Sequence, residues 1–161
     1  LVDPDRHGYQ LHASPNHPKS RGEITLNSSD PYDYPKILFN YLKEEEDLKQ
    51  TRECIHVARK ILSQPALAEH AGDEVGPGFD AQSDDELNEY IRSKADTAYH
   101  PCGTCKMGID DMAVVDQDLK VNGIGNLRVI DASVIPEIPS ANLNAPTLMI
   151  AEKGSEAILN N

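Results

Sequence analysis

The sequence is short of positive charge. Its 161 residues contain 15 lysines and arginines against 27 aspartates and glutamates, which leaves a formal net charge of -12. A chain with this balance offers no basic surface to the phosphates of nucleic acid or to anionic lipid. We therefore expect neither nucleic acid nor a membrane surface among its partners.

Cysteines and long apolar runs are also scarce. Only three cysteines occur, two of them in the Cys-x-x-Cys pair Cys102 and Cys105, which is not the disulfide framework of a small secreted protein. The longest apolar segment, about residues 127–138, contains Asp131 and Glu137 and falls short of the roughly 18 residues of a membrane span. These absences predict a cytoplasmic protein with no integral membrane segment.

The residues that are present suffice for a folded core and three helices. Hydrophobic residues make up 39% of the chain, which is enough to fold. Spacings of three and four predict a helix from Glu44 to Ser63, and a Ser-Asp-Asp-Glu capping box at Ser83 predicts a second that ends near Tyr99. A third is expected from about Pro146 to Leu159. Its expected buried face consists of Leu148, Ala151, Ser155 and Ile158.

The expected strands are short. The run that follows Gly22 alternates polar and apolar residues, which predicts a half-buried strand before the turn at residues 27–31. Residues 126–130 are expected to form a buried strand that ends at Asp131. Further extended segments are expected at 8–13, 34–41, 113–116 and 119–121.

Three clusters between these elements could carry chemistry. They are residues 100–108 (His-Pro-Cys-Gly-Thr-Cys-Lys-Met-Gly), 129–133 (Val-Ile-Asp-Ala-Ser) and 142–147 (Asn-Leu-Asn-Ala-Pro-Thr). Binding and catalytic residues gather at such junctions. His100 follows a predicted helix end, and histidine is the residue type most used for acid–base chemistry, so it is either an acid–base catalyst or a structural histidine.

Cys102 and Cys105 allow three interpretations. Cytidine-type deaminases bind zinc through Pro-Cys-x-x-Cys, but they also need an upstream His-x-Glu, which this sequence lacks. A redox dithiol fits the spacing but lacks a thioredoxin-like βαβ context. The third alternative is a pair of half-buried thiols packed in a turn.

Two residues have both a structural and a binding interpretation. Asp131 ends a predicted strand, where its carboxylate could bind a ribose or ribitol hydroxyl or cap the following turn. Asn144 stands before a predicted helix and is expected to be its N-cap. The free amides and positive end of that helix would favour an anionic ring or oxygen in front of it.

Taken together, the clusters resemble the C-terminal part of the glucose-methanol-choline (GMC) family of flavin alcohol oxidoreductases. The likeness spans about residues 8–159 and is greatest to the choline-oxidising members. It rests on Ser20-Arg21-Gly22, Leu26 to Pro31, Gln82-Ser83-Asp84, Ala98 to Pro101, Asn126 to Ser133 and Asn142 to Thr147. Cys102-Gly103 departs from the Ser-Cys that choline-oxidising members often carry, which weakens the choline assignment relative to other primary alcohols.

The resemblance implies an α+β fold, with a mainly antiparallel substrate-domain sheet, flanking helices, and the final strand and helix of an incomplete FAD-binding domain. Residues 1–108 would form the substrate-binding region and residues 109–161 the segment that returns to the FAD-binding domain. His100 would accept the proton of a primary alcohol, with choline the first candidate, and Asn142 would bind its oxygen while hydride moves to flavin N5. The implied FAD-binding residues are Asp131, Ala132, Asn144, Pro146 and Thr147.

One element of the family is missing. The family binds the ADP part of FAD with an N-terminal βαβ unit carrying Gly-x-Gly-x-x-Gly, and no such fingerprint occurs here. We therefore expect a fragment whose partners are the alcohol substrate and a missing N-terminal FAD-binding half, with no metal. The alternatives are a zinc-dependent, deaminase-like hydrolase using Cys102 and Cys105, and a non-catalytic half that docks on a separate FAD-binding chain.

Overall fold

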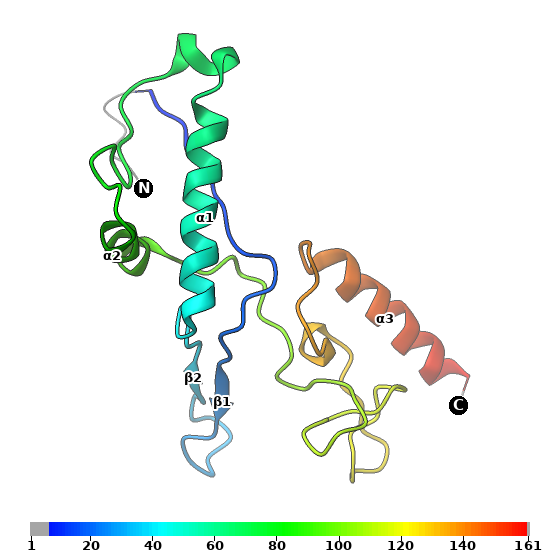
Figure 1. The fold of residues 1–161 in the computed structure, drawn as a ribbon. Coiled ribbons are helices and arrows are strands. Elements are labelled where there is room, and N and C mark those ends of the chain that lie inside the picture. Colours follow the sequence, from blue (N-terminus) through cyan, green and yellow to red (C-terminus); the bar gives the residue numbers. More distant parts are fainter. Residues whose placement is uncertain (1–6, 161) are drawn as a thin grey trace. The chain divides into compact units, whose positions relative to one another are not determined.

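The computed structural model describes residues 7–160 and divides into two compact units (Figure 1). The first consists of the chain up to Arg21 together with Asn40–Asp96, and the second of Gly22–Phe39 together with the chain from Thr97 onward. In chain order the elements are β1 (Glu23–Thr25), β2 (Lys36–Leu38), α1 (Glu45–Leu62), the 3-10 helix η1 (Pro65–His70), α2 (Asp84–Lys94), the 3-10 helix η2 (Ala132–Val134) and α3 (Asn144–Leu159). The fold is mixed, with helices and one small antiparallel sheet among the described residues.

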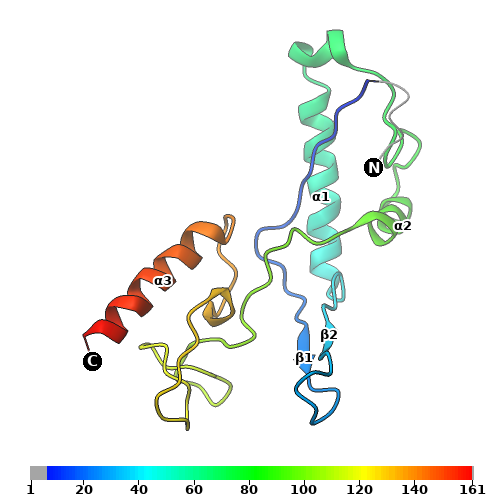
Figure 2. The same ribbon diagram turned by 180° about the vertical axis from the view of Figure 1, so that it is seen from behind.

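Two helices form the centre of the first unit. α1 confirms the predicted helix to within one residue at each end, and its acidic first turn and basic last turn suit the helix dipole. α2 lies beside α1 when the molecule is viewed from either side (Figure 2). The buried apolar residues of the pair are Leu48 in α1 and Leu87 and Ile91 in α2.

The capping box of α2 is formed as predicted. The Ser83 hydroxyl accepts the amide of Glu86, and the Glu86 carboxylate accepts the amide of Ser83 at 2.9 Å. The helix ends at Lys94, however, and not near Tyr99. The helix stops there because the backbone becomes extended at Ala95, which has a φ of -60° and a ψ of 135°.

An extended segment is attached to α1 through a buried carboxylate. Asp47 is only 2% exposed and accepts the amide of Lys19 at 2.6 Å and that of Ser20 at 2.8 Å. The Ser20 hydroxyl also donates to Asp47. The strand expected at residues 8–13 is not formed, because this part of the chain pairs with no partner strand among the described residues.

The second unit contains a β-hairpin. β1 and β2 pair antiparallel with Ile24 opposite Ile37, which confirms strands within both predicted segments. The expected half-burial is wrong, since every residue of both strands is exposed. Alternation predicts which residues share a face, but two strands provide no second layer to cover that face.

The other predicted strands are replaced by single bridges. Residues 113–130 pair only at isolated positions: Met107 with Val115, Val115 with Val121, and Lys120 with Arg128. Leu119 and Asn126 have positive φ values of 65° and 61°, so the chain turns too often for a ladder to extend. The buried strand expected at 126–130 is therefore wrong, and Asn126 and Leu127 are exposed.

The core of the second unit is built around α3. Its buried members are Val115, Leu119, Val134, Ile135, Leu143 and Ile150. α3 starts at Asn144, two residues earlier than predicted, and buries Ile150 and Gly154. The predicted buried face is wrong: Leu148 is 60% and Ile158 52% exposed. A buried face predicted from the spacing of apolar side chains does not include Gly154, although a glycine lets the helix pack closely against its neighbour.

Candidate functional site

The segment that begins at His100 follows a sharp change in backbone direction. Tyr99 has a φ of 60° and Gly103 a φ of 89°, so both lie in the left-handed region. Between them stand His100, which is half-buried, and Pro101. This backbone places the histidine at a defined position before the chain enters the core at Cys102.

Two backbone hydrogen bonds join this segment to the second motif. The amide of Cys105 donates to the carbonyl of Ser133 at 2.9 Å, and the amide of Met107 donates to that of Val134 at 2.8 Å. A Cβ at position 103 would lie 3.3 Å from the carbonyl oxygen of Ile135. Residues 103–107 and 131–135 therefore lie against each other.

Asp131 is the N-cap of η2. Its Oδ1 accepts the amide of Ser133 at 2.7 Å, so the capping role that the sequence left open is confirmed. The residue is exposed, and Oδ2 accepts no hydrogen bond from the described residues. Ala132 is half-buried against the core. One oxygen of Asp131 thus fixes the turn, and the other is available for a second donor.

The third motif leads into α3. Leu143 is buried and is the N-cap residue, so the prediction that Asn144 is the cap is wrong; Asn144 is the first residue of the helix. The hydroxyl of Thr147 donates to the carbonyl of Leu143 at 2.6 Å. Leu143 occupies the cap position because its side chain anchors in the core, a tertiary preference that overrides the polar preference of N-caps.

The start of α3 leaves polar groups open. The amides of Asn144 and Ala145 have no acceptor among the described residues, and Pro146 has no amide hydrogen. Asn142 and Asn144 are exposed, whereas Pro146 and Thr147 are half-buried. The positive end of a helix of 16 residues therefore faces outward here.

One core connects the three motifs. Cys102 and Ala132 pack against the cluster that contains Leu143. Their neighbours His100, Asp131 and Asn142 are each within two residues of one of these core contacts. All the residues expected at the site belong to the second unit, at the boundary between its core and solvent.

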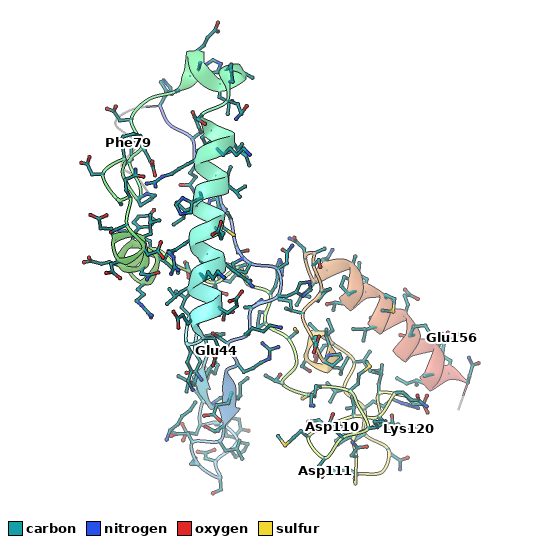
Figure 3. The ribbon with its side chains drawn as sticks, in the orientation of Figure 1. Glu44, Phe79, Asp110, Asp111, Lys120 and Glu156 are labelled. Atoms are coloured by element: carbon teal, nitrogen blue, oxygen red, sulfur yellow. The ribbon has the colours of Figure 1, made fainter. Side chains whose placement is uncertain are left out.

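Two hollows lie on the surface of the second unit. One of about 1000 Å³ is lined by residues 120–128 with Asp116, Ile130 and Ile158, and another of about 310 Å³ lies between residues 117–119 and the end of α3. Lys120 and Glu156, which mark their walls, stand on a loop and on α3 (Figure 3). Neither of these two hollows is lined by His100 or Asn142.

The side chains that could bind zinc are not clustered among the described residues. Nowhere in residues 7–160 do three His, Cys, Asp or Glu side chains lie close enough together to hold a metal ion. Cys102 and Cys105 are both half-buried, and neither is in a disulfide. Cys105 lies in the Gly103–Lys106 turn, and Cys102 stands directly before it.

A family model described as GMC oxidoreductase matches residues 18–151, which include all three motifs. The chain belongs to the GMC oxidoreductase family. An oxygen-dependent choline dehydrogenase from Photobacterium profundum is 50% identical to it over 159 residues, 98% of this chain. These residues span 28% of that relative's length. The resemblance stated from the motifs is confirmed.

Solved structures agree with this assignment. Pyridoxine 4-oxidase from Mesorbium loti superposes with a TM-score of 0.83 and 31% identity over 91% of this GMC chain and 28% of its own. An FAD-dependent oxidoreductase from Chaetomium thermophilum gives a TM-score of 0.84 and 28% identity, covering 89% of this chain and 25% of its own. The family and its structural neighbours are flavoenzymes that use FAD. No helix among the described residues is long and apolar enough to cross a membrane.

Sequence patterns did not reveal which residues position the GMC motifs. Three residues hold the motif segments in place. Gly103 provides a left-handed turn, the Ser133 carbonyl accepts a hydrogen bond, and Leu143 packs in the core. Only Gly103 carries a sequence signal, since a glycine inside a motif often marks a positive φ. A backbone acceptor such as the Ser133 carbonyl leaves no mark on residue type.

Proposed function

We propose that the protein to which this chain belongs oxidises a primary alcohol, choline, with FAD as its hydride acceptor. The supporting observation is the packing of the three motifs on one core, with His100, Asp131 and Asn142 each within two residues of a core contact. The 50% identity to an oxygen-dependent choline dehydrogenase favours choline among the alcohols.

In this proposal His100 is the base. Its imidazole takes the hydroxyl proton of the substrate, because the unprotonated ring nitrogen of a neutral histidine can accept a proton. The turn at Tyr99 and the rigid Pro101 limit where the ring can lie. Asn142 donates its side-chain amide to the alcohol oxygen, and the buried Leu143 beside it holds its backbone in place.

The residues next to this pair fit a flavin. The open Oδ2 of Asp131 can accept a ribitol hydroxyl, and the open amides of Asn144 and Ala145 can donate to the pyrimidine edge, beside Pro146 and Thr147. Ala132 lies at the Asp131 turn. When bound, FAD accepts hydride from the alcohol carbon. The positive end of α3 favours the negative charge that arrives with it.

The same proposal assigns a different role to each part of the chain. Residues 1–108 contribute the substrate-binding region, including a sheet to which β1 and β2 belong, and residues 109–161 complete the FAD-binding domain. The ADP part of the cofactor binds outside this chain, which has no Gly-x-Gly-x-x-Gly. That missing fingerprint also leaves a second candidate, in which the chain docks on a separately encoded FAD-binding chain.

Replacing His100 tests the proposed chemistry. In the full-length protein we expect His100→Ala to lower kcat for choline by about 100- to 10 000-fold at unchanged FAD content. His70→Ala is the matched control, because His70 is an exposed histidine in η1 of the first unit. Near-normal turnover of His100→Ala would refute the assignment of the base.

A mixing experiment distinguishes a single polypeptide from two separately encoded chains. If a separate chain binds FAD, adding it to the 161-residue chain restores alcohol oxidation that neither has alone. If FAD and the motifs belong to one polypeptide, the gene encodes the Gly-x-Gly-x-x-Gly unit upstream in the same reading frame.

A further inference from the structure

Two thiols next to the proposed base have no role in the proposed reaction. Cys102 and Cys105 are both half-buried, and neither is in a disulfide. Cys102 packs against the core cluster and stands two residues after His100. Any covalent change at this pair acts at the edge of the site.

The backbone forms a tight turn from Gly103 to Lys106, which contains Cys105 and begins directly after Cys102. Gly103 has a φ of 89°, and its carbonyl accepts the amide of Lys106 at 3.2 Å. Cys105 is held separately by the hydrogen bond of its amide to the Ser133 carbonyl at 2.9 Å. Two residues separate the cysteines, the spacing at which disulfide oxidoreductases close and reopen their disulfide.

We propose that Cys102 and Cys105 form a reversible disulfide, with hydrogen peroxide as the oxidant, and that this bond lowers the activity of the site. The thiolate of one cysteine attacks the peroxide, the O–O bond breaks, and a sulfenic acid and water form. The second thiol attacks that sulfur, the S–S bond forms and a second water leaves. The two thiols lose two electrons, and each peroxide molecule gains two. A dithiol reductant reverses the change.

Such a regulatory bond does not require a thioredoxin-like fold. It requires a pair at the right spacing, access for a small oxidant and an effect on a neighbouring group. The first two requirements are met by the separation of two residues between the cysteines and by the partial exposure of both. Reversible disulfides of this kind are the type found in reducing compartments.

The effect on the site follows from the packing of Cys102. Its side chain lies against the core that also holds Leu143, next to Asn142. Formation of an S–S bond draws the Cys102 sulfur toward Cys105 and shifts the backbone that carries His100. Because small displacements of a catalytic group cost large factors in rate, we expect kcat to fall by at least about tenfold.

Cys54 serves as the control thiol for the Cys102 and Cys105 pair. It lies within α1, in the first unit, where its nearest cysteine in the sequence is Cys102. Burial raises the pKa of the Cys54 thiol, and the neighbouring Glu53 carboxylate raises it further. A thiol that rarely ionises reacts slowly with peroxide, so Cys54 should remain reduced.

The test uses the full-length, FAD-loaded protein, first reduced and then treated with hydrogen peroxide. Mass spectrometry after alkylation should find a peptide in which Cys102 and Cys105 are linked, while Cys54 is alkylated. Alcohol oxidation should fall at least about tenfold and recover with dithiothreitol. Cys105→Ser should be unable to show this reversible loss, and Cys54→Ser should behave as the parent protein.

The expected effect of the disulfide on activity rests on the proposed function, but different results would overturn the disulfide and the proposed function. A reduced protein without alcohol oxidation would overturn the proposed function, while the linked peptide and its reversal by dithiothreitol would still decide whether the disulfide forms. Absence of the linked peptide, at peroxide concentrations that oxidise a small dithiol, would overturn the disulfide. A linked peptide in a protein that keeps full activity would overturn the effect on the site.

Discussion

Gly154 of α3 lies directly against the side chain of Ile130. A Cβ at position 154 would lie 2.5 Å from Cγ2 of Ile130 and 2.8 Å from its Cδ1. Real carbon atoms do not approach so closely, so the absence of a side chain at 154 sets how near α3 comes to residue 130. This contact helps to hold α3, and hence the open amides at its start, on the core.

Gly154→Ala should therefore destabilise the protein. Alanine favours a helix over glycine by about 0.5–1 kcal/mol, but overpacking against Ile130 costs about 1–3 kcal/mol, so the net change is a loss. Chemical unfolding of the two proteins measures the difference. The double variant Ile130→Ala/Gly154→Ala removes both of these Ile130 atoms, so the alanine at 154 should no longer add to the loss. An equal penalty for Gly154→Ala with and without Ile130 would contradict this account.

Asp47→Ala tests the anchor of the N-terminal segment. Truncation leaves the amides of Lys19 and Ser20 without their acceptor, which should cost about 2 kcal/mol of unfolding free energy. Glu45→Ala is the matched control, because Glu45 is an exposed acid in the same first turn, and its removal should cost only about 0.5 kcal/mol. Similar losses for both variants would mean that helix-dipole charge, and not the hydrogen bonds, accounts for the effect.

The same carboxylate should contribute to acid sensitivity. Burial acts to raise the pKa of Asp47, but hydrogen bonds from the Ser20 side chain and from the amides of Lys19 and Ser20, together with the Arg21 charge, outweigh it and lower the pKa. A group with a depressed folded-state pKa stabilises above its unfolded pKa of about 3.9, and this stability is lost as the pH falls through the folded value. Urea unfolding at pH 7 and near pH 3 should therefore show a larger loss for the parent protein than for Asp47→Asn. Parallel losses would exclude Asp47 as the source.

Gly103→Ala should impair the site more than the fold. The substitution meets a φ of 89° and a carbonyl oxygen 3.3 Å from the new Cβ, so we expect a loss of about 1–2 kcal/mol and a fall in kcat. Gly125→Ala is the control, since position 125 has open space and no positive φ. If Gly103→Ala kept the parent kcat, the left-handed turn would not position His100.

Local patterns in the sequence were sufficient to predict the helices. The 3.6-residue spacing predicted α1, and the Ser83–Glu86 capping box correctly predicted where α2 begins. The end of α2 was predicted wrongly because the backbone is already extended at Ala95. The buried face of α3 was predicted wrongly because it includes the close-packed Gly154. The expected division at residue 108 and the catalytic and flavin-binding roles remain predictions.

The sequence by itself determined the family, because the order and spacing of three motifs are properties of the chain and need no folding to be recognised. It also determined the charge of -12 and the missing dinucleotide fingerprint. Only the tertiary structure decided that Cys102, Ala132 and Leu143 pack on one core, and that Leu143 rather than Asn144 caps α3. The physical reason is that such contacts join residues about 10 to 40 positions apart. Their free energy comes from burial in a shared core, which local residue preferences do not encode.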